Sequence, residues 1–232
     1  MCKLKSGIAL LNRIYVAEHD SHSAMLEELG IKDDYLGASK KFVRWELSPA
    51  DDDPFSDIDP FSDIDTWVLK VDQDIVPEWW SEEEYRPQIV EAVKEWAKTH
   101  IYIGVNDLKL NTGTNYYIKD CKDVEVWGSS SVEAWESSSV VARGSSSVVA
   151  RGSSRVVARG SSRVVAWESS SVVARESSVI QNSNVFPWEN KDSLILSENA
   201  TFKDNIGKVI YQSGDFKLVS VESGKTIADV NV

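Results

Sequence analysis

The sequence predicts an α+β N-terminal domain, then a β-solenoid (β-helix) of eight-residue strand–turn repeats with 16 residues per coil, then a small β C-terminal cap. Two observations predict the solenoid. Motifs of the type VVARGSSS recur every eight residues, and the same positions of the octad stay apolar throughout. The change from mixed sequence to strict repeat divides the chain into residues 1–107, 108–182 and 183–232.

The N-terminal domain has the composition of a mixed α/β unit. Strands are expected over residues 7–16, 42–47 and 66–71, where apolar and β-branched residues are frequent. A short helix is expected over residues 21–30, with Ser21 as N-cap and Gly30 as the stop signal. The apolar residues of 86–100 fall on one helical face, so a longer amphipathic helix is expected there, before the chain enters the solenoid.

An acidic segment, DDDPFSDIDPFSDID, occupies residues 51–65 and duplicates the motif DPFSDI. Its seven aspartates suggest a Ca²⁺ loop, but the glycine and the closing glutamate of an EF-hand are missing. A solvated acidic loop, lengthened by the duplication, is the favoured interpretation.

The octads run without interruption from residue 108 to residue 179. Position one is apolar in nine successive octads: Leu108, Tyr116, Val124, Val132, Val140, Val148, Val156, Val164 and Val172. Position three is also apolar: Leu110, Ile118, Val126, Ala134, Ala142, Ala150, Ala158, Ala166 and Ala174. Residues two apart share one face of a strand, so both columns are expected to point inward.

A Gly/Glu-Ser-Ser-Ser turn follows each short strand. Small residues fill position six from Gly113 through Cys121 to Ser177, and we expect them to turn inward at the corner and bond the backbone there. Two octads make a flattened, two-sided coil and three make a triangular one, and the sequence favours two. Serine-rich disorder is the alternative, but the unbroken Val and Ala columns argue against it.

Beyond the octads the sequence becomes irregular. Leu194 and Leu196 fall in strand positions of an octad-like segment, 194–201. Residues 206–212 and 216–222 have the alternation of a β-hairpin. We expect this region to cap the open end of the solenoid, because exposed sheet ends promote association.

Charge is distributed unevenly along the chain. The net charge is −12, and residues 1–115 carry 12 Lys and Arg against 23 Asp and Glu. Residues 116–179 carry 8 against 7. Nucleic-acid binding needs clustered cations, so the N-terminal region argues against a nucleic-acid partner. No apolar run has the length of a membrane span, and two cysteines, Cys2 and Cys121, do not make a disulfide framework.

Candidate chemical groups are few. His19 and His22 could ligate a metal, but no further ligands cluster with them, so a surface loop is the favoured interpretation. Cys121 is expected to be a small inward residue rather than a nucleophile. Trp79 and Trp80, beside the acidic residues 82–84, are interpreted as core and rim rather than a binding patch. We therefore expect no catalytic residues, no metal, no cofactor and no small-molecule substrate.

The candidate interaction surface is the outer face of the solenoid. Positions two and four are expected to point outward, and position four is rich in the residue types that dominate binding hot spots: Trp127, Trp135, Arg143, Arg151, Arg159, Trp167 and Arg175. In a 16-residue coil, Trp127, Arg143, Arg159 and Arg175 form one column, and Arg151 lies between Trp135 and Trp167 in the other. These columns could equally serve only to stabilise the solenoid.

Four segments together carry a family resemblance: SGIALLNRIYVAEHDSHSAMLEELGIKD, FVRWELSP, DTWVLKVDQDIVPEWW and VEAVKEWAKTHI, followed by the SSSVVARG array and the tail SENATFKDNIGKVIYQSGDFKLVSV. The chain resembles an uncharacterised family encoded by bacteriophages and prophages of gut bacteria, apart from its duplicated DPFSDI. The resemblance implies no functional residues.

The resemblance implies no activity either. From the solenoid and its outer columns we expect a non-enzymatic interaction protein, encoded by a mobile element as the resemblance implies, that binds or inhibits a host component in the bacterial cytoplasm. The expected partner is another protein or a second copy of the chain, not a membrane. A structural, virion-associated solenoid and an enzyme hidden in the N-terminal domain are the alternatives.

Overall fold

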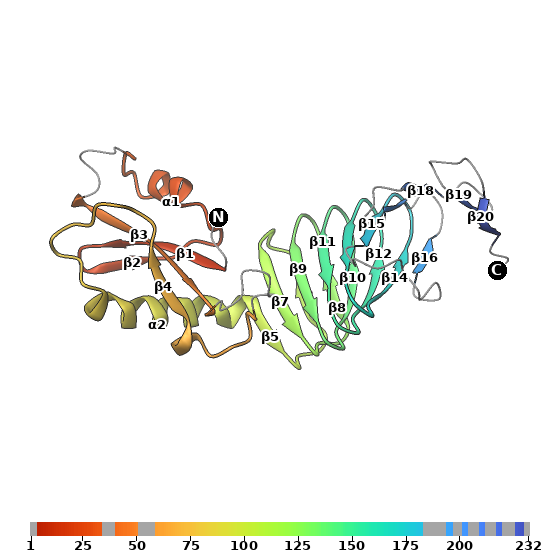
Figure 1. The fold of residues 1–232 in the computed structure, drawn as a ribbon, viewed down its shortest axis with the longest axis horizontal. Helices are drawn as coiled ribbons and strands as arrows, with labels where there is room; N and C mark the ends of the chain where they lie inside the picture. The colour runs from red at the N-terminus through yellow and green to blue at the C-terminus, as the bar shows by residue number, and fades with distance from the viewer. Residues whose placement is uncertain are drawn as a thin grey trace. The chain divides into compact units, whose positions relative to one another are not determined.

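The computed structural model describes residues 4–33, 40–50 and 59–182, and beyond these five strands up to residue 229 (Figure 1). The chain forms two compact units, residues 1–101 and 102–232. Residues 51–58 lie outside the described residues, so the expected acidic loop is described only from Asp59 onward.

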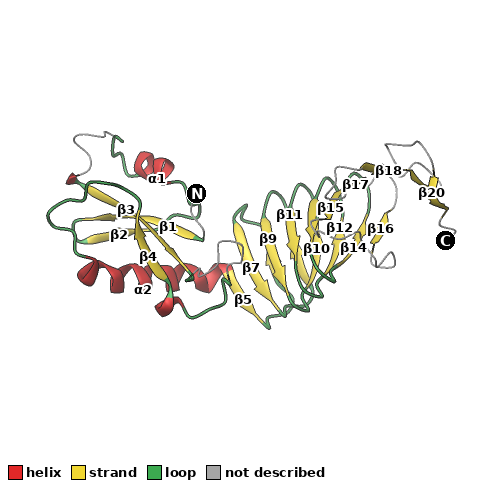
Figure 2. Ribbon diagram, viewed as in Figure 1, coloured by secondary structure: helices red, strands yellow, loops and turns green. Residues whose placement is uncertain are grey.

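The first unit contains a four-stranded antiparallel sheet in the order β2-β1-β3-β4 (Figure 2). Its strands are β1 (Lys5–Leu10), β2 (Arg13–Tyr15), β3 (Phe42–Ser48) and β4 (Val68–Val71), and a 3-10 turn, η2 (Ile64–Thr66), precedes β4. The single strand expected over residues 7–16 is wrong. The chain turns at Asn12, whose φ of 66° is tolerated by asparagine, and forms a hairpin.

The α-helices of this unit are α1 (His22–Glu28) and α2 (Glu82–His100). The N-cap prediction is confirmed, because the Ser21 hydroxyl accepts a hydrogen bond from the Ala24 N–H at 3.3 Å. Helix α2 begins four residues before the expected start. The apolar face used to place the helix begins only later, whereas three glutamates, Glu82 to Glu84, occupy the true first turn, where the helix dipole favours them.

The second unit is a two-sided β-solenoid of parallel strands. One sheet has the order β16-β14-β12-β10-β8-β6, and the other has the order β18-β17-β15-β13-β11-β9-β7-β5. The strands up to residue 182 are β5 (Ile101–Ile103), β6 (Lys109–Leu110), β7 (Asn115–Lys119), β8 (Val124–Val126), β9 (Ser131–Trp135), β10 (Ser139–Ala142), β11 (Ser147–Ala150), β12 (Arg155–Ala158), β13 (Arg163–Ala166), β14 (Ser171–Ala174) and β15 (Val179–Asn182).

Beyond residue 182, β16 (Leu194–Leu196) and β17 (Thr201–Lys203) continue the two parallel sheets. The remaining strands are antiparallel: β18 (Val209–Tyr211) pairs with β17, and β19 (Lys217–Val219) pairs with β20 (Thr226–Asp229). The expected hairpin of residues 206–212 with 216–222 is not formed among the described strands, because β18 pairs with β17 instead.

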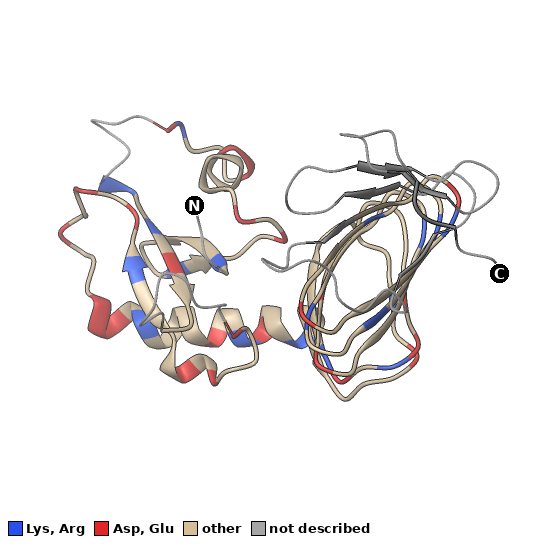
Figure 3. Cartoon of the chain, turned by 45° about the vertical axis from the view of Figure 1, so that its right-hand side comes forward, with Lys and Arg blue, Asp and Glu red and all other residues tan. Residues whose placement is uncertain are grey.

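The register confirms a coil of 16 residues. Val140 pairs with Val156 and with Val124 in one sheet, and Val148 pairs with Val164 and Val132 in the other. Figure 3 looks partly along this unit, and its coils superimpose as one flattened loop with two long walls. Each residue therefore lies about 4.8 Å above its equivalent 16 residues earlier.

Positions one and three point inward, as predicted. From Leu110 to Ile180, every residue of these two positions whose burial is described belongs to one continuous buried cluster. Leu108, at the start of the first octad, is half-buried and packs against this cluster. The expected inward turn of position six is wrong: Ser129 and its equivalents to Ser177 are exposed, and only Cys121 is buried. The buried serines occupy position seven: Ser130, Ser138, Ser146, Ser154, Ser162, Ser170 and Ser178. Position seven lies two residues before position one, and strand alternation gives it the same face.

Several of these position-seven serines bond the backbone at the corner of the coil. The hydroxyl of Ser138 donates to the Trp135 carbonyl at 2.7 Å, and Ser170 and Ser178 bond the carbonyl three residues earlier in the same way. Ser146 and Ser162 differ, because their buried hydroxyls have no hydrogen-bond partner among the described residues. Backbone bonding by small corner residues thus occurs at position seven, not at position six as predicted.

Position five makes the corner itself. From Asp120 to Glu176 every position-five residue has a positive φ, whether it is Gly, Asp or Glu. A side chain is disfavoured in this region by about 1–2 kcal/mol. Two glutamates offset that cost: Glu168 and Glu176 accept hydrogen bonds from the N–H groups of Gly152 and Gly160, one coil earlier, at 2.6 and 2.7 Å.

The 16-residue register makes a prediction for deletions. Deleting residues 140–155 removes one coil and keeps every later strand in its sheet. Deleting only residues 140–147 exchanges the two sheets for every later strand and misplaces the C-terminal strands. We expect the eight-residue deletion to melt at least about 4 °C below the 16-residue deletion in a thermal denaturation followed by circular dichroism. Equal melting temperatures would contradict a two-sided coil.

The corners make a second prediction, in which Gly128 is the control for Gly160. Both have φ near 68°, but a Cβ on Gly128 meets nothing within 4 Å, while one on Gly160 lies 2.9 Å from the Gly144 carbonyl oxygen. Gly128→Ala should lower the free energy of unfolding by about 1 kcal/mol, from the φ alone. Gly160→Ala should lower it by about 2–3 kcal/mol, since the neighbouring coil must also shift. Urea denaturation measures both, and equal losses would exclude a contribution from coil stacking.

Candidate protein-interaction surface

The outward residues of position four form two columns, one on each wall of the solenoid. Trp127, Arg143, Arg159 and Arg175 follow strands β8, β10, β12 and β14, so they share one wall. Trp135, Arg151 and Trp167 follow or end β9, β11 and β13 on the other. The two columns predicted from the sequence are confirmed by the strand register.

We call the outer surface around Trp135, Arg151 and Trp167 the tryptophan face. The Arg151 guanidinium carbon lies 4.9 Å from the Trp135 ring centroid and 5.4 Å from that of Trp167. Its Nε also lies 3.9 Å from the Glu133 carboxylate. Arg151 is therefore held on both sides by indoles and neutralised by an acid of the preceding coil.

We call the opposite outer surface, around Val141, Val157, Val173, Arg143, Arg155, Arg159 and Arg175, the arginine face. Arg143 lies 4.8 Å from the Trp127 ring centroid, and its Nη2 lies 3.6 Å from Glu125. Arg155, Arg159 and Arg175 have no hydrogen-bonded or ion-paired side-chain partner among the residues that the structure describes. The two walls thus differ in the neighbours of their arginines: Arg151 has a carboxylate and two indoles beside it, whereas most arginines of the arginine face have no described acidic partner.

The run of three arginines carries an electrostatic cost. Arg143, Arg159 and Arg175 follow one another at the coil spacing, and two like charges at that distance repel by about 1 kcal/mol even in water. Only Arg143 has an indole and a carboxylate beside it. The tryptophan face avoids this repulsion by placing tryptophans on both sides of its arginine.

A half-buried ridge of valines lies beside the arginine column. Val141, Val157 and Val173 occupy position two of successive coils on the same wall, between Arg155 at position eight and the position-four arginines. Trp127, 42% exposed, lies on the same wall. Aromatic residues and arginines around an apolar centre are the composition of protein-binding surfaces.

The histidines singled out in the sequence are engaged with protein atoms. His19 contacts Glu28 through Nε2 at 2.9 Å, and its Nδ1 accepts from the Ser21 N–H. Both ring nitrogens of His22 lie 3.1 Å from oxygen atoms, those of Asp72 and the Trp45 carbonyl. Neither imidazole therefore offers a free nitrogen, and no group of three or more potential metal ligands occurs in the described parts of the chain.

The N-terminal unit holds two buried polar side chains, Lys5 and His100, whose carboxylate partners the sequence did not reveal. Lys5, fully buried, donates to Asp20 at 2.6 Å and lies 5.1 Å from the Trp96 ring centroid. His100, also buried, stacks on Trp96 and contacts Glu18 at 2.7 Å. Each partner lies far away in sequence, so no local pattern marks the pairing.

Two carboxyl groups have displaced pKa values. The Tyr15 hydroxyl, and then His19, donate hydrogen bonds to Glu28 and lower its pKa. In the solenoid, Ser137 donates both its hydroxyl and its backbone N–H to Asp120 and lowers the pKa of that carboxyl group. Both groups are exposed, and both shifts follow from contacts that hold a loop or a corner in place rather than from a catalytic environment.

Cys121, Trp79 and Trp80 are the other residues that the sequence singled out. Cys121 is buried, as expected for an inward residue. Trp79 and Trp80 contact Tyr85, with ring centroids 5.4 and 5.1 Å away, so they form one aromatic cluster at the start of α2. No described helix is long and apolar enough to cross a membrane.

No protein-family model, no curated protein and no solved structure matches the chain.

The two faces make a prediction about stability. Arg151→Ala removes two guanidinium–indole contacts and should lower the free energy of unfolding by about 1–2 kcal/mol. Arg163→Ala, on the same wall but exposed and without a described partner, should change it by no more than about 0.5 kcal/mol. Chemical denaturation compares the two variants. If both are neutral, the tryptophan face does not stabilise the solenoid.

Proposed function

We propose that this chain is a non-enzymatic protein-interaction protein whose arginine face binds an acidic surface of a protein partner. The observation that carries the proposal is the set of three arginines, Arg155, Arg159 and Arg175, that have no described acidic partner although they lie on adjacent strands. Carboxylates of a partner would offset their mutual repulsion, and the valine ridge would supply apolar area to bury.

A rigid wall favours such binding. The strands that carry the arginines are joined by parallel pairing in one sheet, and the position-eight and position-four residues start and follow those strands. Side chains mounted this way lose less conformational freedom on binding than side chains of a loop. Arginine also presents a planar donor fork that fits a carboxylate with two hydrogen bonds.

The tryptophan face, in this proposal, stabilises the solenoid and does not bind the partner. Its arginine is held by two indoles and neutralised by Glu133, so it has less to gain from a partner. The family resemblance adds the expectation that the partner is a component of a bacterial host cell, encountered in its cytoplasm.

A photocrosslinking amino acid tests the proposal at single-residue resolution. It would replace Val157 on the arginine face or, as the control, Val165 on the tryptophan face, in chains expressed in a gut-bacterial host. We expect protein adducts at position 157 and not at position 165, identified by mass spectrometry. Equal adducts at both positions, or none at position 157, would contradict the proposal.

Charge-matched variants make the test specific. Arg159→Ser with Arg175→Ser should reduce the adducts at position 157 about tenfold or more. Arg163→Ser with Lys119→Ser removes the same charge from the opposite wall, where Lys119 ends β7 and Arg163 starts β13, and should leave the adducts unchanged. Loss of adducts in both pairs would mean that net charge, not the arginine face, attracts the partner.

A further inference from the structure

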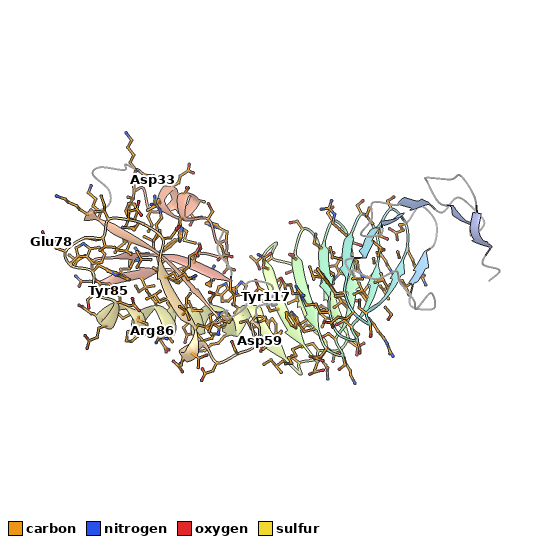
Figure 4. The ribbon with its side chains drawn as sticks, in the orientation of Figure 1. Asp33, Asp59, Glu78, Tyr85, Arg86 and Tyr117 are labelled. Carbon is orange, nitrogen blue, oxygen red and sulfur yellow. The ribbon has the colours of Figure 1, made fainter. Side chains whose placement is uncertain are left out.

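The N-terminal unit carries a surface whose chemistry is the complement of the arginine face. Between Lys70 and Arg86 the chain has six acidic residues and no basic one, namely Asp72, Asp74, Glu78, Glu82, Glu83 and Glu84. All six are exposed. We call residues 72–84 the acidic segment. Figure 3 colours the backbone of Asp and Glu residues red, and Figure 4 labels Glu78 in the loop that leads into α2.

The acidic segment also exposes apolar side chains. Ile75 is 57% exposed and Val76 is 43% exposed. Trp79 and Trp80, in the same segment, are half-buried. Exposed aliphatic residues inside a run of carboxylates are the counterpart of the valine ridge inside its rows of arginines.

Hydrogen bonds hold this segment in a defined conformation. The Gln73 side-chain amide donates to the carbonyls of Ile75 at 2.7 Å and Phe42 at 3.3 Å, and its oxygen accepts from the Arg44 N–H at 2.9 Å. The Trp79 indole donates to the Lys40 carbonyl at 3.1 Å. The surface is thus preorganised, and a partner would bind it without a large ordering cost.

The two surfaces lie on units of contrasting charge. Residues 1–101 carry 11 Lys and Arg against 22 Asp and Glu, a net charge of −11. The arginine face presents four arginines with one described acidic neighbour, Glu125. Complementary fields of this kind steer association and fix its orientation.

We propose that the partner of the arginine face is a second copy of this chain, whose acidic segment, residues 72–84, docks on Arg155, Arg159 and Arg175 with Ile75 and Val76 against the valine ridge. This inference rests on the proposed function, because it names the partner of the same face. The two contacting surfaces differ, so the association is heterologous and extends head to tail from one copy to the next.

Charge exchange between the two surfaces tests the inference on the purified full-length chain. One variant carries Arg155→Glu, Arg159→Glu and Arg175→Glu, and the other carries Asp74→Lys, Glu78→Lys and Glu83→Lys. In each variant alone, the two contacting surfaces carry charges of the same sign. Each variant should therefore sediment as a monomer at concentrations where the parent associates. Their mixture restores opposite charges at every contact and should associate again. Circular dichroism and thermal melting verify that both variants fold.

Salt dependence supplies an independent readout. Raising the salt from about 0.05 M to about 0.5 M shortens the screening length severalfold and should weaken self-association of the parent chain about tenfold or more. The charge-matched pair Arg163→Ser and Lys119→Ser, on the opposite wall, should associate as the parent does.

Isotope-mixed crosslinking locates the contact. A photocrosslinker at position 157 of an unlabelled chain, mixed with ¹⁵N-labelled chain, should capture labelled peptides that contain residues 72–86. Links only within one chain, links to other segments, or a mixture of variants that stays monomeric would overturn the inference. A monomeric purified chain that still forms adducts at position 157 with another protein in cells would sink the self-association and leave the proposed function standing.

Discussion

The structure of the solenoid depends on parallel strand pairing at a repeat of 16 residues. Val140 lies opposite Val156, and Val148 opposite Val164, so each side chain stacks on its equivalent in the next coil. Strand hydrogen bonding fixes the spacing, and strand alternation fixes which residues face the core. The buried column from Leu110 to Ile180 and the two outer columns are both consequences of this one register. A slip of one octad would exchange the two walls and mix their columns.

The same register makes residue identity at the outer positions unusually consequential, because every charge meets its equivalents about 4.8 Å away. A tryptophan on each side of Arg151 makes that position stabilising, whereas arginine after arginine on the opposite wall is repulsive. The corners follow the same logic. Glycine accepts the positive φ directly, while Glu168 and Glu176 reach back to an N–H group of the preceding coil. Two walls built from nearly identical octads thus acquire different chemistry from single substitutions.

The N-terminal unit is organised by contacts between distant residues rather than by a repeat. The buried Lys5 on β1 pairs with Asp20, and the buried His100 at the end of α2 contacts Glu18, which is largely exposed. Replacing Asp20 would be costly, because the Lys5 ammonium group would stay desolvated. The acidic side chains of residues 72–84 lie on the surface, where the described contacts engage only Asp72, through His22. An acidic unit and an uncompensated arginine face in one chain are what suggest association between copies.

The octad sequence determined most of the solenoid by itself: the inward columns, the two-sided coil and the stacking of Arg151 between Trp135 and Trp167. It could do so because identical short repeats have one dominant way to bury their apolar columns, and alternation then places every other strand residue. Alternation also places the serines of position seven inward, and our assignment of position six failed because the positive φ at position five turns the chain outward there. The hairpin at Asn12 and the early start of α2 have local signals, the asparagine turn and the run Glu82 to Glu84, that our reading of the apolar pattern missed. The pairs Lys5–Asp20 and His100–Glu18 were decided only by the tertiary structure. The members of these pairs are separated by 15 and 82 residues, and no local pattern encodes a contact that folding alone brings together.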